Sequence, residues 1–469
     1  PFLNICKENH TAIRIGVNHG SLSDRIMSRY GDTPEGMVES CMEFLRICVA
    51  ENFTDVVISI KASNTVVMVK TVRLLVDVME KEGMTFPLHL GVTEAGDGED
   101  GRIKSALGIG ALLSDGLGDT IRVSLSEAPE AEIPVARKLV DYVLLRQDHP
   151  YIPGLEAPEF NYLSPERRKT KAVRNIGGEH VPVVIADRMD GKTEVNPQFT
   201  PDYIYAGRAL PEQREEGVEY ILDADVWQGE AGTWPAFNHA QLPLMGECDA
   251  ALKFLFIPYM AQTDEVIACL KYHPEVVIIS QSNHPNRLGE HRALVHQLMT
   301  EGLQNPVVFF QHYAEDDAEN LQIKSAADMG ALIFDGLCDG IFLFNQGSLS
   351  HAVVDATAFG ILQAGRTRTS KTEYISCPGC GRTLYDLEKT IARIKAATSH
   401  LKGLKIGIMG CIVNGPGEMA DADYGYVGAG RGKISLYKGK VCVEKNIPEE
   451  EAVERLLEFI RTDREENQQ

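Results

Sequence analysis

An internal repeat is the feature of this sequence that most limits its fold. Residues 102–123 (RIKSALGIGALLSDGLGDTIRV) and 322–343 (QIKSAADMGALIFDGLCDGIFL) are identical at 12 of 22 positions. At nearly the same offset VVISIKASN pairs with VVIISQSNH, and VRLLVDVMEKEGMTFP pairs with HRALVHQLMTEGLQNP. A match that persists through three successive strand–helix units indicates that a whole block of the fold was duplicated.

The repeated units alternate strand-like runs with amphipathic stretches, a pattern typical of βα units around a parallel sheet. Within 1–150 the strands are predicted at 12–18, 55–61, 88–94 and 120–126. Four units are half of a (β/α)₈ barrel, which normally has about 250 residues. We therefore predict an α/β fold in which 1–150 is the second half of a TIM-type barrel. The chain opens PFLNICKENH, without an initiator Met, so we expect the other half to be missing from its start.

The middle of the chain, 151–370, is predicted to be a linker followed by an inserted, barrel-like α/β domain. Residues 151–203 are Pro-rich, polar and aperiodic, which is typical of a linker. The βα rhythm resumes after residue 204, with strands in ALKFLFIPYM, EVVIISQS, PVVFFQHY and GIFLFNQ. This second copy keeps the framework of the repeat but loses its polar groups, so we expect a structural role. The replacements are Lys61 by Gln281, Glu94 by Tyr313, Arg122 by Phe342, and Ser124 by Phe344.

Charge and composition exclude several classes of function. The formal net charge of −21 argues against nucleic-acid and membrane-surface binding, because both need a positive field. No apolar run approaches the ~20 residues that span a bilayer. Ten cysteines in 469 residues are too sparse for a disulfide scaffold. An anionic substrate would therefore depend on a few local Arg and Lys side chains.

Three cysteines in the last segment, 371–469, differ from the other seven. Cys377 and Cys380 share the tight turn CPGC, and Cys411 follows the predicted strand KIGIMG. Thiolates select zinc, copper(I) or an iron–sulfur cluster. The nearest downstream carboxylate is Glu418, and the turn residues NGPG before it would return it toward Cys411. We expect these four residues to be the metal ligands; a structural zinc, a thioredoxin-like dithiol and buried thiols remain alternatives.

Basic and polar residues also recur inside the apolar strands of 1–150. Arg14 and Asn18 lie on one face of their strand, as do Arg122 and Ser124 of theirs, and Lys61 ends another strand. Charged residues within such runs are costly without partners. The carboxyl ends of barrel strands are where such folds keep their sites. Guanidinium and ammonium groups that converge there suit a diphosphate, although solvated surface charges are the simpler alternative.

At this point the motifs carry a resemblance to a known family. RIGVNHGSLSDRI, SIKAS, HLGVTEAG, KSALGIGALLSDGLGDTIRVSL, SCPGCGRT and GCIVNGPGE together resemble the 4-hydroxy-3-methylbut-2-enyl diphosphate synthases. The match covers 11–126 and 373–469, and the segment between them resembles the extra domain of the large, plant-type form, here N-terminally truncated. The resemblance implies a C-terminal α+β domain like a sulfite or nitrite reductase half-domain.

The resemblance also implies an activity and a cofactor. The family opens 2-C-methyl-D-erythritol 2,4-cyclodiphosphate reductively to (E)-4-hydroxy-3-methylbut-2-enyl diphosphate, in the non-mevalonate isoprenoid pathway. It uses a [4Fe–4S] cluster, with reduced ferredoxin or flavodoxin as electron donor. The resemblance implies that Glu94 is an acid/base residue. The alternative is that Glu94 caps a helix N-terminus or forms an ion pair with Arg122. Glu418 would be catalytic as well as a ligand.

Other functions and assemblies stay open at this stage. A non-catalytic electron-transfer or scaffold protein is the main alternative, yet a pure carrier has no need of the charged strand ends. A sulfite or nitrite reductase would need a sirohaem and more cysteines. We expect a monomer or homodimer in the bacterial cytoplasm, or in the plastid stroma if the source is a plant or alga.

Overall fold

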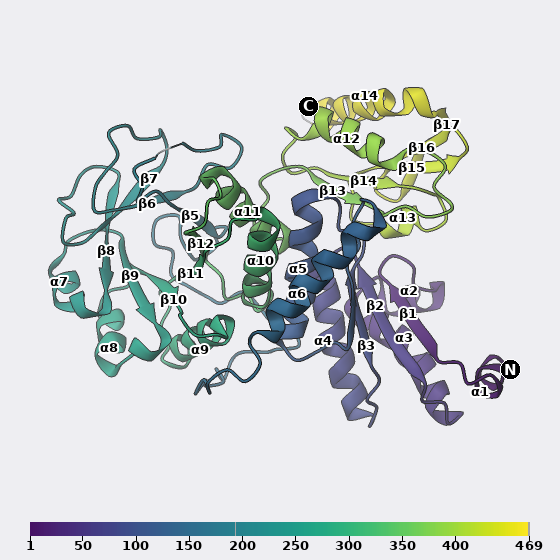
Figure 1. Ribbon diagram of the computed structural model, residues 1–469, viewed down its shortest axis with the longest axis horizontal. Helices are drawn as coiled ribbons and strands as arrows, with labels where there is room; N and C mark the ends of the chain where they lie inside the picture. The colour runs from purple at the N-terminus through teal and green to yellow at the C-terminus, as the bar shows by residue number, and fades with distance from the viewer. Residues whose placement is uncertain (193, 468–469) are drawn as a thin grey trace. The chain divides into compact units, whose positions relative to one another are not determined.

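The computed structural model describes residues 1–192 and 194–467, and these form two compact units. Unit 1 combines both ends of the chain, 1–139 and 369–469, whereas unit 2 comprises Val140–Arg368. Figure 1 shows both units with their elements labelled. Among the described residues, no helix has both the length and the apolar character needed to cross a membrane.

A four-stranded parallel sheet begins unit 1. Its order is β1-β2-β3-β4, with β1 at Ile13–Asn18, β2 at Val56–Ala62, β3 at Leu88–Val92 and β4 at Thr120–Arg122. The connections are α2 (Asp24–Tyr30), α3 (Pro34–Ala50), α4 (Thr65–Lys81) and α5 (Gly98–Ser114); α1 (Phe2–Glu8) precedes the sheet, and η1 (Pro129–Ala131) and α6 (Glu132–Leu144) follow it. The carboxyl ends of all four strands therefore meet at one edge, as the βα rhythm predicts.

The helices that connect these strands begin at residues that commonly cap helix N-termini. The Thr33 hydroxyl accepts a hydrogen bond from Gly36 N at 3.1 Å, and Pro34 occupies the first helical position of α3. Asn64 caps α4 by accepting from Val66 N and Val67 N. β3 and β4 are shorter than predicted, since they end at Val92 and Arg122 rather than at residues 94 and 126. The residues just beyond these two strands therefore need not keep the extended conformation of a strand.

A mixed five-stranded sheet completes unit 1. Its order is β13 (Glu373–Ser376), β14 (Lys405–Met409), β15 (Tyr424–Gly430), β16 (Lys433–Lys438) and β17 (Val441–Pro448). The first three strands are parallel and the last three antiparallel. Helices α12 (Leu387–Thr398) and α14 (Glu449–Asn467) lie on the same side of this sheet in Figure 1. Their apolar faces share one core with the strands, for example Ile391 and Leu456 with Ile406.

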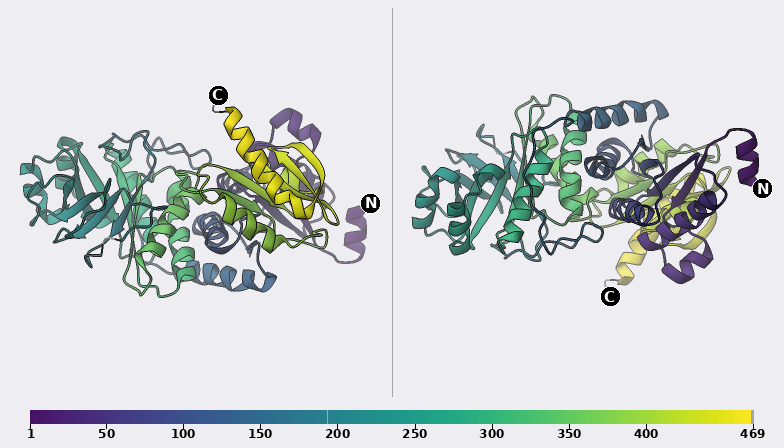
Figure 2. Two further views of the ribbon diagram at one scale, coloured as in Figure 1. Left: turned by 90° about the horizontal axis from the view of Figure 1, so that it is seen from above. Right: turned by 90° about the horizontal axis from the view of Figure 1, so that it is seen from below.

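Unit 2 is a closed barrel of eight parallel strands. The strands are β5 (Val183–Asp187), β6 (Tyr203–Gly207), β7 (Glu219–Asp223), β8 (Thr233–Asn238), β9 (Lys253–Pro258), β10 (Val276–Gln281), β11 (Val307–Tyr313) and β12 (Gly340–Asn345). β12 pairs with β5, which closes the ring. The views of Figure 2 show the green helices of this unit outside the strands. Those helices are α9 (Arg287–Thr300), α10 (Ala318–Phe334) and α11 (His351–Ala364), and α7 (Leu242–Glu247) and α8 (Asp264–Tyr272) precede them.

The sequence-based account of unit 2 needs correction in two respects. Residues 151–203 were expected to be a linker, but β5 lies within them at Val183–Asp187. Four strands, β5 to β8, were not predicted at all. Among the described residues, no helix lies between β5 and β8, so the alternation that marks a βα unit is absent there. The inserted segment is a closed barrel, in agreement with the barrel-like domain predicted from the sequence.

Candidate active site

The two sheets of unit 1 meet at the carboxyl edge of β1–β4. Ala95, just after β3, forms a parallel bridge with Ser376 at the end of β13. The Ser126 hydroxyl lies 2.7 Å from the Ser376 hydroxyl and 2.9 Å from its carbonyl oxygen. The buried Lys104 of α5 pairs with Glu373 at 2.9 Å. These contacts place the loops that carry the three cysteines over the strand ends.

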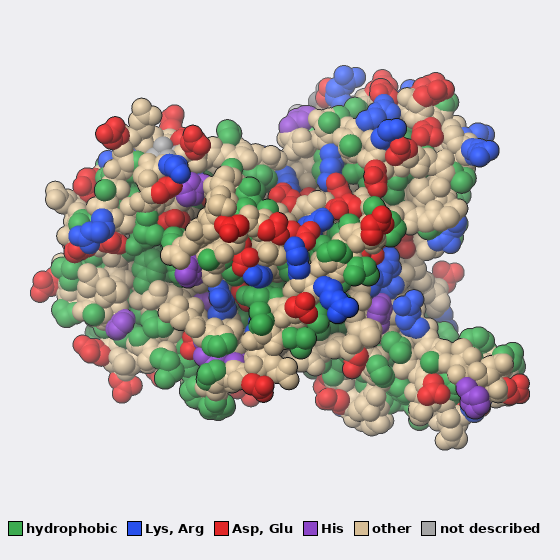
Figure 3. Space-filling view, in the orientation of Figure 1, with side chains coloured by type: hydrophobic (Ala, Val, Ile, Leu, Met, Phe, Trp, Pro, Cys, Tyr) green, Lys and Arg blue, Asp and Glu red, His purple; other side chains and the backbone are tan. Residues whose placement is uncertain are grey.

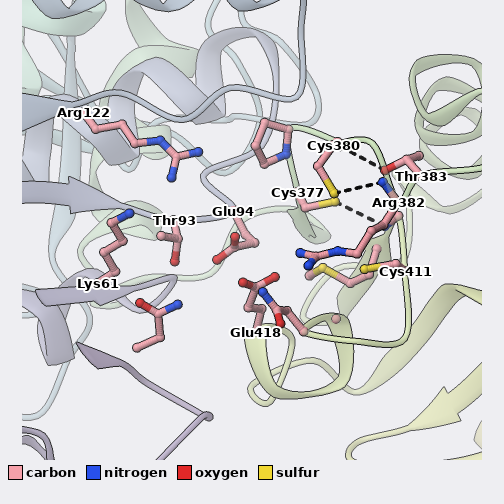
Figure 4. A pocket seen from close by; sticks show the side chains of 17 residues that line it. Lys61, Thr93, Glu94, Arg122, Cys377, Cys380, Arg382, Thr383, Cys411 and Glu418 are labelled. Atoms are coloured by element: carbon pink, nitrogen blue, oxygen red, sulfur yellow. Dashed lines mark hydrogen bonds between the residues drawn. The ribbon is translucent and has the colours of Figure 1, made fainter. Parts of the chain in front are cut away.

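A cavity of about 270 Å³ lies where the two sheets meet. Figure 4 shows Lys61 and Arg122 at one end of it, Glu94 and Glu418 facing each other in the centre, and the three cysteines at the other end. Thus most of the residues singled out in the sequence line one cavity. They are Asn18, Lys61, Glu94, Arg122, Cys377, Cys380, Cys411 and Glu418.

Two of the predicted substrate residues do not line this cavity. Arg14 is exposed on β1 and lines a separate apolar groove, although its charge still acts on Lys61. Ser124 is buried and accepts a hydrogen bond from Arg122 Nη2 at 3.4 Å. In this structure Ser124 therefore orients Arg122, whereas Arg14 contributes long-range charge.

The basic end of the cavity is preorganised for an anion. Burial lowers the pKa of Lys61, and the neighbouring guanidinium groups of Arg122 and Arg14 lower it further. These like charges repel one another, and a polyanion bound beside Lys61 and Arg122 would relieve that repulsion. On the face of the molecule seen in Figure 3, acidic and basic side chains are interspersed. The positive field therefore comes from this local group, not from the net charge of the chain.

Glu94 is held in an unusual state by its backbone and its surroundings. Its φ of 49° lies in the left-handed region that non-glycine residues seldom adopt, and strain of this kind clusters at functional sites. The side chain is 5% exposed, and its Oε2 has no hydrogen-bond partner among the described residues. Burial, and then the charge of Glu418, raise the pKa of Glu94 to about 8. Both effects favour the protonated form of this carboxyl. The N-cap alternative is wrong, since Asp97 occupies the N-cap position of α5.

The cysteine loops are stabilised by hydrogen bonds to sulfur and by a threonine. Gly410 N donates to Cys377 Sγ at 3.2 Å, and Arg382 N donates to Cys380 Sγ at 3.4 Å. Cys380 N in turn donates to the Thr383 hydroxyl at 3.1 Å. The hydrogen bond from Arg382 N lowers the pKa of the exposed Cys380, whereas burial raises the pKa of Cys377. Such N–H groups stabilise thiolates.

Glu418 reaches the cavity from a helix rather than from the turn that was expected. The NGPG residues form the start of α13, Gly415–Glu418, with Pro416 near its N-terminus. Burial raises the pKa of Glu418, while a hydrogen bond from Asn414 opposes that effect. Its backbone carbonyl accepts from the Ser63 hydroxyl at 3.3 Å. Both carboxyls, Glu94 and Glu418, thus lie between the basic end and the sulfur atoms.

Arg382 is a cavity residue that sequence reasoning missed. Its guanidinium lies beside the sulfur atoms in Figure 4, and a hydrogen bond to Cys411 together with the charge of Cys380 raises its pKa. The signal was present in the motif SCPGCGRT, where an arginine follows the second cysteine by two positions. Thr93 and Thr383 also line the cavity and were not predicted.

The donor set suits an iron–sulfur cluster, because such clusters are held by cysteine thiolates. Three cysteines line the cavity, and backbone N–H groups donate to the sulfur atoms of Cys377 and Cys380. Glu418 is the carboxylate available beside them.

Comparison with known protein families gives one match in each of the two chain segments that form unit 1. Residues 1–137 match the GcpE TIM-barrel domain, and residues 373–462 match the GcpE protein C-terminal domain. The chain is 95% identical over 466 residues to the 4-hydroxy-3-methylbut-2-en-1-yl diphosphate synthase (flavodoxin) of Bacteroides thetaiotaomicron, covering 99% of the chain and 76% of that relative.

More distant relatives carry the same name. The protein of that name from Bacteroides fragilis (strain ATCC 25285) is 85% identical, with 98% of the chain and 74% of the relative covered. The one from Chlorobaculum tepidum is 41% identical, with 98% of the chain and 71% of the relative covered. The similarity therefore extends over the middle segment, which neither matched domain includes.

Proposed function

The chain belongs to the 4-hydroxy-3-methylbut-2-en-1-yl diphosphate synthase family, and from this premise we propose that the cavity of unit 1 is its active site. The chain is an iron–sulfur oxidoreductase of isoprenoid biosynthesis. Its reaction is the reductive ring opening and dehydroxylation of 2-C-methyl-D-erythritol 2,4-cyclodiphosphate to (E)-4-hydroxy-3-methylbut-2-enyl diphosphate. The observation that carries the assignment of the site is one cavity lined by Lys61, Arg122, Glu94 and three cysteines.

The basic end of the cavity binds the diphosphate in this proposal. Arg122 offers a planar fork that matches phosphate oxygens, and Ser124 fixes its orientation. Lys61 supplies a second charge at the end of β2, and Asn18 a neutral donor at the end of β1. Arg14 stands farther out and steers the anion by its field. A pure electron carrier would gain nothing from this group of residues.

The sulfur end holds the [4Fe–4S] cluster in this proposal, with Cys377, Cys380, Cys411 and Glu418 as ligands. When bound there, the cluster would supply the electrons for the reductive cleavage of a carbon–oxygen bond. Cys380 is exposed, and the hydrogen bond from Arg382 N favours its thiolate. A carboxylate is a harder and weaker ligand for iron than thiolate. Glu418 is therefore the exchangeable member of the set.

Glu94 is the proton source in this proposal. Because its pKa is raised to about 8, the carboxyl is protonated when a hydroxyl must leave as water. It faces Glu418 across the cavity, between the bound anion and the sulfur atoms (Figure 4). Because Glu94 is buried, bulk water does not reach the proton of its carboxyl. The hydroxyl of the substrate is therefore the group that accepts this proton.

The remaining expectations stand as proposals. Flavodoxin, or ferredoxin, is the proposed electron donor, and the names of the relatives support flavodoxin. A bacterial cytoplasmic location is supported by the bacterial relatives. The likeness to the large form of the family rests on the inserted barrel between the two matched domains. The domain limits 1–150, 151–370 and 371–469, the monomer or homodimer, and the likeness of 371–469 to a sulfite or nitrite reductase half-domain belong to the same proposal.

The role of Glu418 is tested with Glu418→Ala after anaerobic reconstitution. We expect iron and sulfide contents close to those of the parent chain, because three cysteines still hold the cluster. Turnover should fall by roughly 100-fold or more, and the Mössbauer parameters of the one distinct iron should change. A variant that keeps both its turnover and its spectrum would show that Glu418 is not a ligand.

A further inference from the structure

Two glycines, one from each half of unit 1, face each other beside the cavity. Gly20 follows β1 in a left-handed conformation with φ of 81°, and Gly417 lies in α13 next to Glu418. A Cβ atom placed on Gly417 would meet Gly20 O at 2.7 Å and Ser21 Oγ at 3.1 Å. A Cβ atom on Gly20 would collide with the carbonyl of Gly417. The two backbones therefore touch directly, and neither position has room for a side chain.

The neighbouring contacts hold both loops in this position. Gly20 N donates to Asp32 Oδ1 at 3.0 Å, which fixes the loop after β1. On the other side, the Ser63 hydroxyl donates to Glu418 O, and Asn64 Nδ2 donates to Asp421 Oδ2 at 3.2 Å. α13 is therefore fastened to the loops after β1 and β2. The carboxyl of Glu418 enters the cavity from this fastened helix.

We propose that Gly20 and Gly417 are positioning residues, whose missing side chains let α13 sit deep enough to place Glu418 opposite Glu94. The proposal deepens the function proposed above and rests on it. A methyl group at either position would have to lift α13 away from the strand ends, because the closest atom it meets is a backbone oxygen. Glu418 would move with α13, while Cys377 and Cys380, on another loop, would keep their places. Catalytic groups that are displaced by about 1 Å lose much of their effect.

The variant Gly417→Ala distinguishes the effect of this contact from the backbone strain that replacing a glycine can cause. Gly417 lies in a helix and has no positive φ, so alanine suits its backbone better than glycine does. Any loss must then come from the contact with Gly20. Gly20→Ala approaches the same contact from the other loop, and it keeps the test available if Gly417→Ala gives little folded protein. Gly430→Ala is the matched control, since a Cβ atom there meets nothing within 4 Å.

The experiment uses the anaerobically reconstituted full chain and two measurements. For both contact variants we expect iron content equal to that of the parent, kcat lower by roughly tenfold or more, and faster amide exchange in 19–21 and 415–419. Gly430→Ala should match the parent in both measurements. The double variant should lose no more than the worse single variant, because one methyl group already opens the contact.

Outcomes that overturn the proposal are equally specific. Unchanged exchange in both contact variants would refute the contact, and faster exchange with unchanged kcat would refute its positioning role. If turnover were lost without faster amide exchange, the loss would not come from the contact between the two glycines. If the parent chain and Gly430→Ala made no product, the proposed function would fail, and amide exchange alone would still decide whether the two glycines hold α13.

Discussion

At the residue scale, the site depends on side chains whose surroundings change their chemistry. Glu94 is buried in a left-handed backbone conformation, with Glu418 as its nearest like charge. In the second copy of the repeat its place is taken by Tyr313, which donates to the buried Asp328 at 2.6 Å. The same position thus serves packing in unit 2, whereas in unit 1 proton chemistry is its proposed role. The change from Glu to Tyr was visible in the sequence, whereas the raised pKa was not.

Replacing Glu94 tests its role as the proton source. Glu94→Gln keeps the shape and the hydrogen-bonding capacity of the neutral carboxyl but has no proton to give. Product formation should fall by roughly 100-fold, with unchanged iron content, in an assay with a chemical reductant. The matched control is Glu82→Gln, which removes a surface carboxylate that pairs with Arg46. Equal rates for the parent and Glu94→Gln would assign the proton to another group.

His291 makes the stability of unit 2 depend on pH. The ring is fully buried, its Nδ1 lies 2.7 Å from the Ser280 hydroxyl, and burial lowers its pKa to about 3. The unfolded chain binds a proton below about pH 6.5 while the folded chain does not, so stability falls as pH falls from 6.5 toward 3. At pH 5 this costs about 2 kcal/mol. His291→Gln should flatten the pH dependence of the urea midpoint; an unchanged slope would contradict this.

At the element scale, the repeat is preserved in buried polar contacts as well as in strands. Asp119 Oδ2 accepts from Leu88 N at 2.8 Å, and in the second copy Asp339 Oδ2 accepts from Val307 N at 3.0 Å. Both aspartates precede the last strand of their repeat and fix the start of the preceding one. Duplication therefore kept the framework contacts while the strand ends diverged. Packing constrains the framework contacts, whereas only the bound ligand constrains the residues at the strand ends.

A buried ion pair occurs in both copies with different burial. Arg73 and Asp115 join α4 to the end of α5 at 2.8 Å, with both side chains nearly inaccessible. The equivalent Arg292 and Asp335 are also 2.8 Å apart, but the arginine is partly exposed. Arg73→Met should destabilise unit 1 by about 3–5 kcal/mol, because it removes the charge of Arg73 from beside the buried carboxylate of Asp115. Arg292→Met should cost clearly less. Urea unfolding of both variants checks the order, and equal losses would contradict it.

The predicted elements were most accurate where strands and helices alternate. Strands β1 to β4 and β9 to β12 coincide with apolar runs that the sequence marks clearly. Strands β5 to β8 are five or six residues long and are joined by Gly- and Pro-containing loops, so their pattern resembles a linker. Consecutive strands pair from β5 to β9, but the pairing that closes the ring joins β5 to β12, which is distant along the chain. Local patterns do not record such pairings.

At the scale of the whole molecule, the cavity is built from the two ends of the chain. The cysteines could be grouped from their spacing, and the basic strand ends from their shared edge. That both groups share one cavity depends on contacts such as Ala95 with Ser376, which no local pattern shows. The contact of Gly20 with Gly417 is hidden for the same reason. Arg14 shows the converse error, since a shared strand face with Asn18 did not bring it into the cavity.

The most direct test of the account is a turnover measurement with the cyclodiphosphate, after anaerobic reconstitution and with a chemical reductant. Lys61→Ala removes a charge at the basic end, and Cys411→Ser removes a proposed sulfur ligand at the opposite end. The account predicts product from the parent chain, a rate lower by roughly 100-fold for Lys61→Ala with unchanged iron content, and loss of both iron and product for Cys411→Ser. Product formation at the parent rate by either variant, or none from a fully reconstituted parent chain, would contradict it.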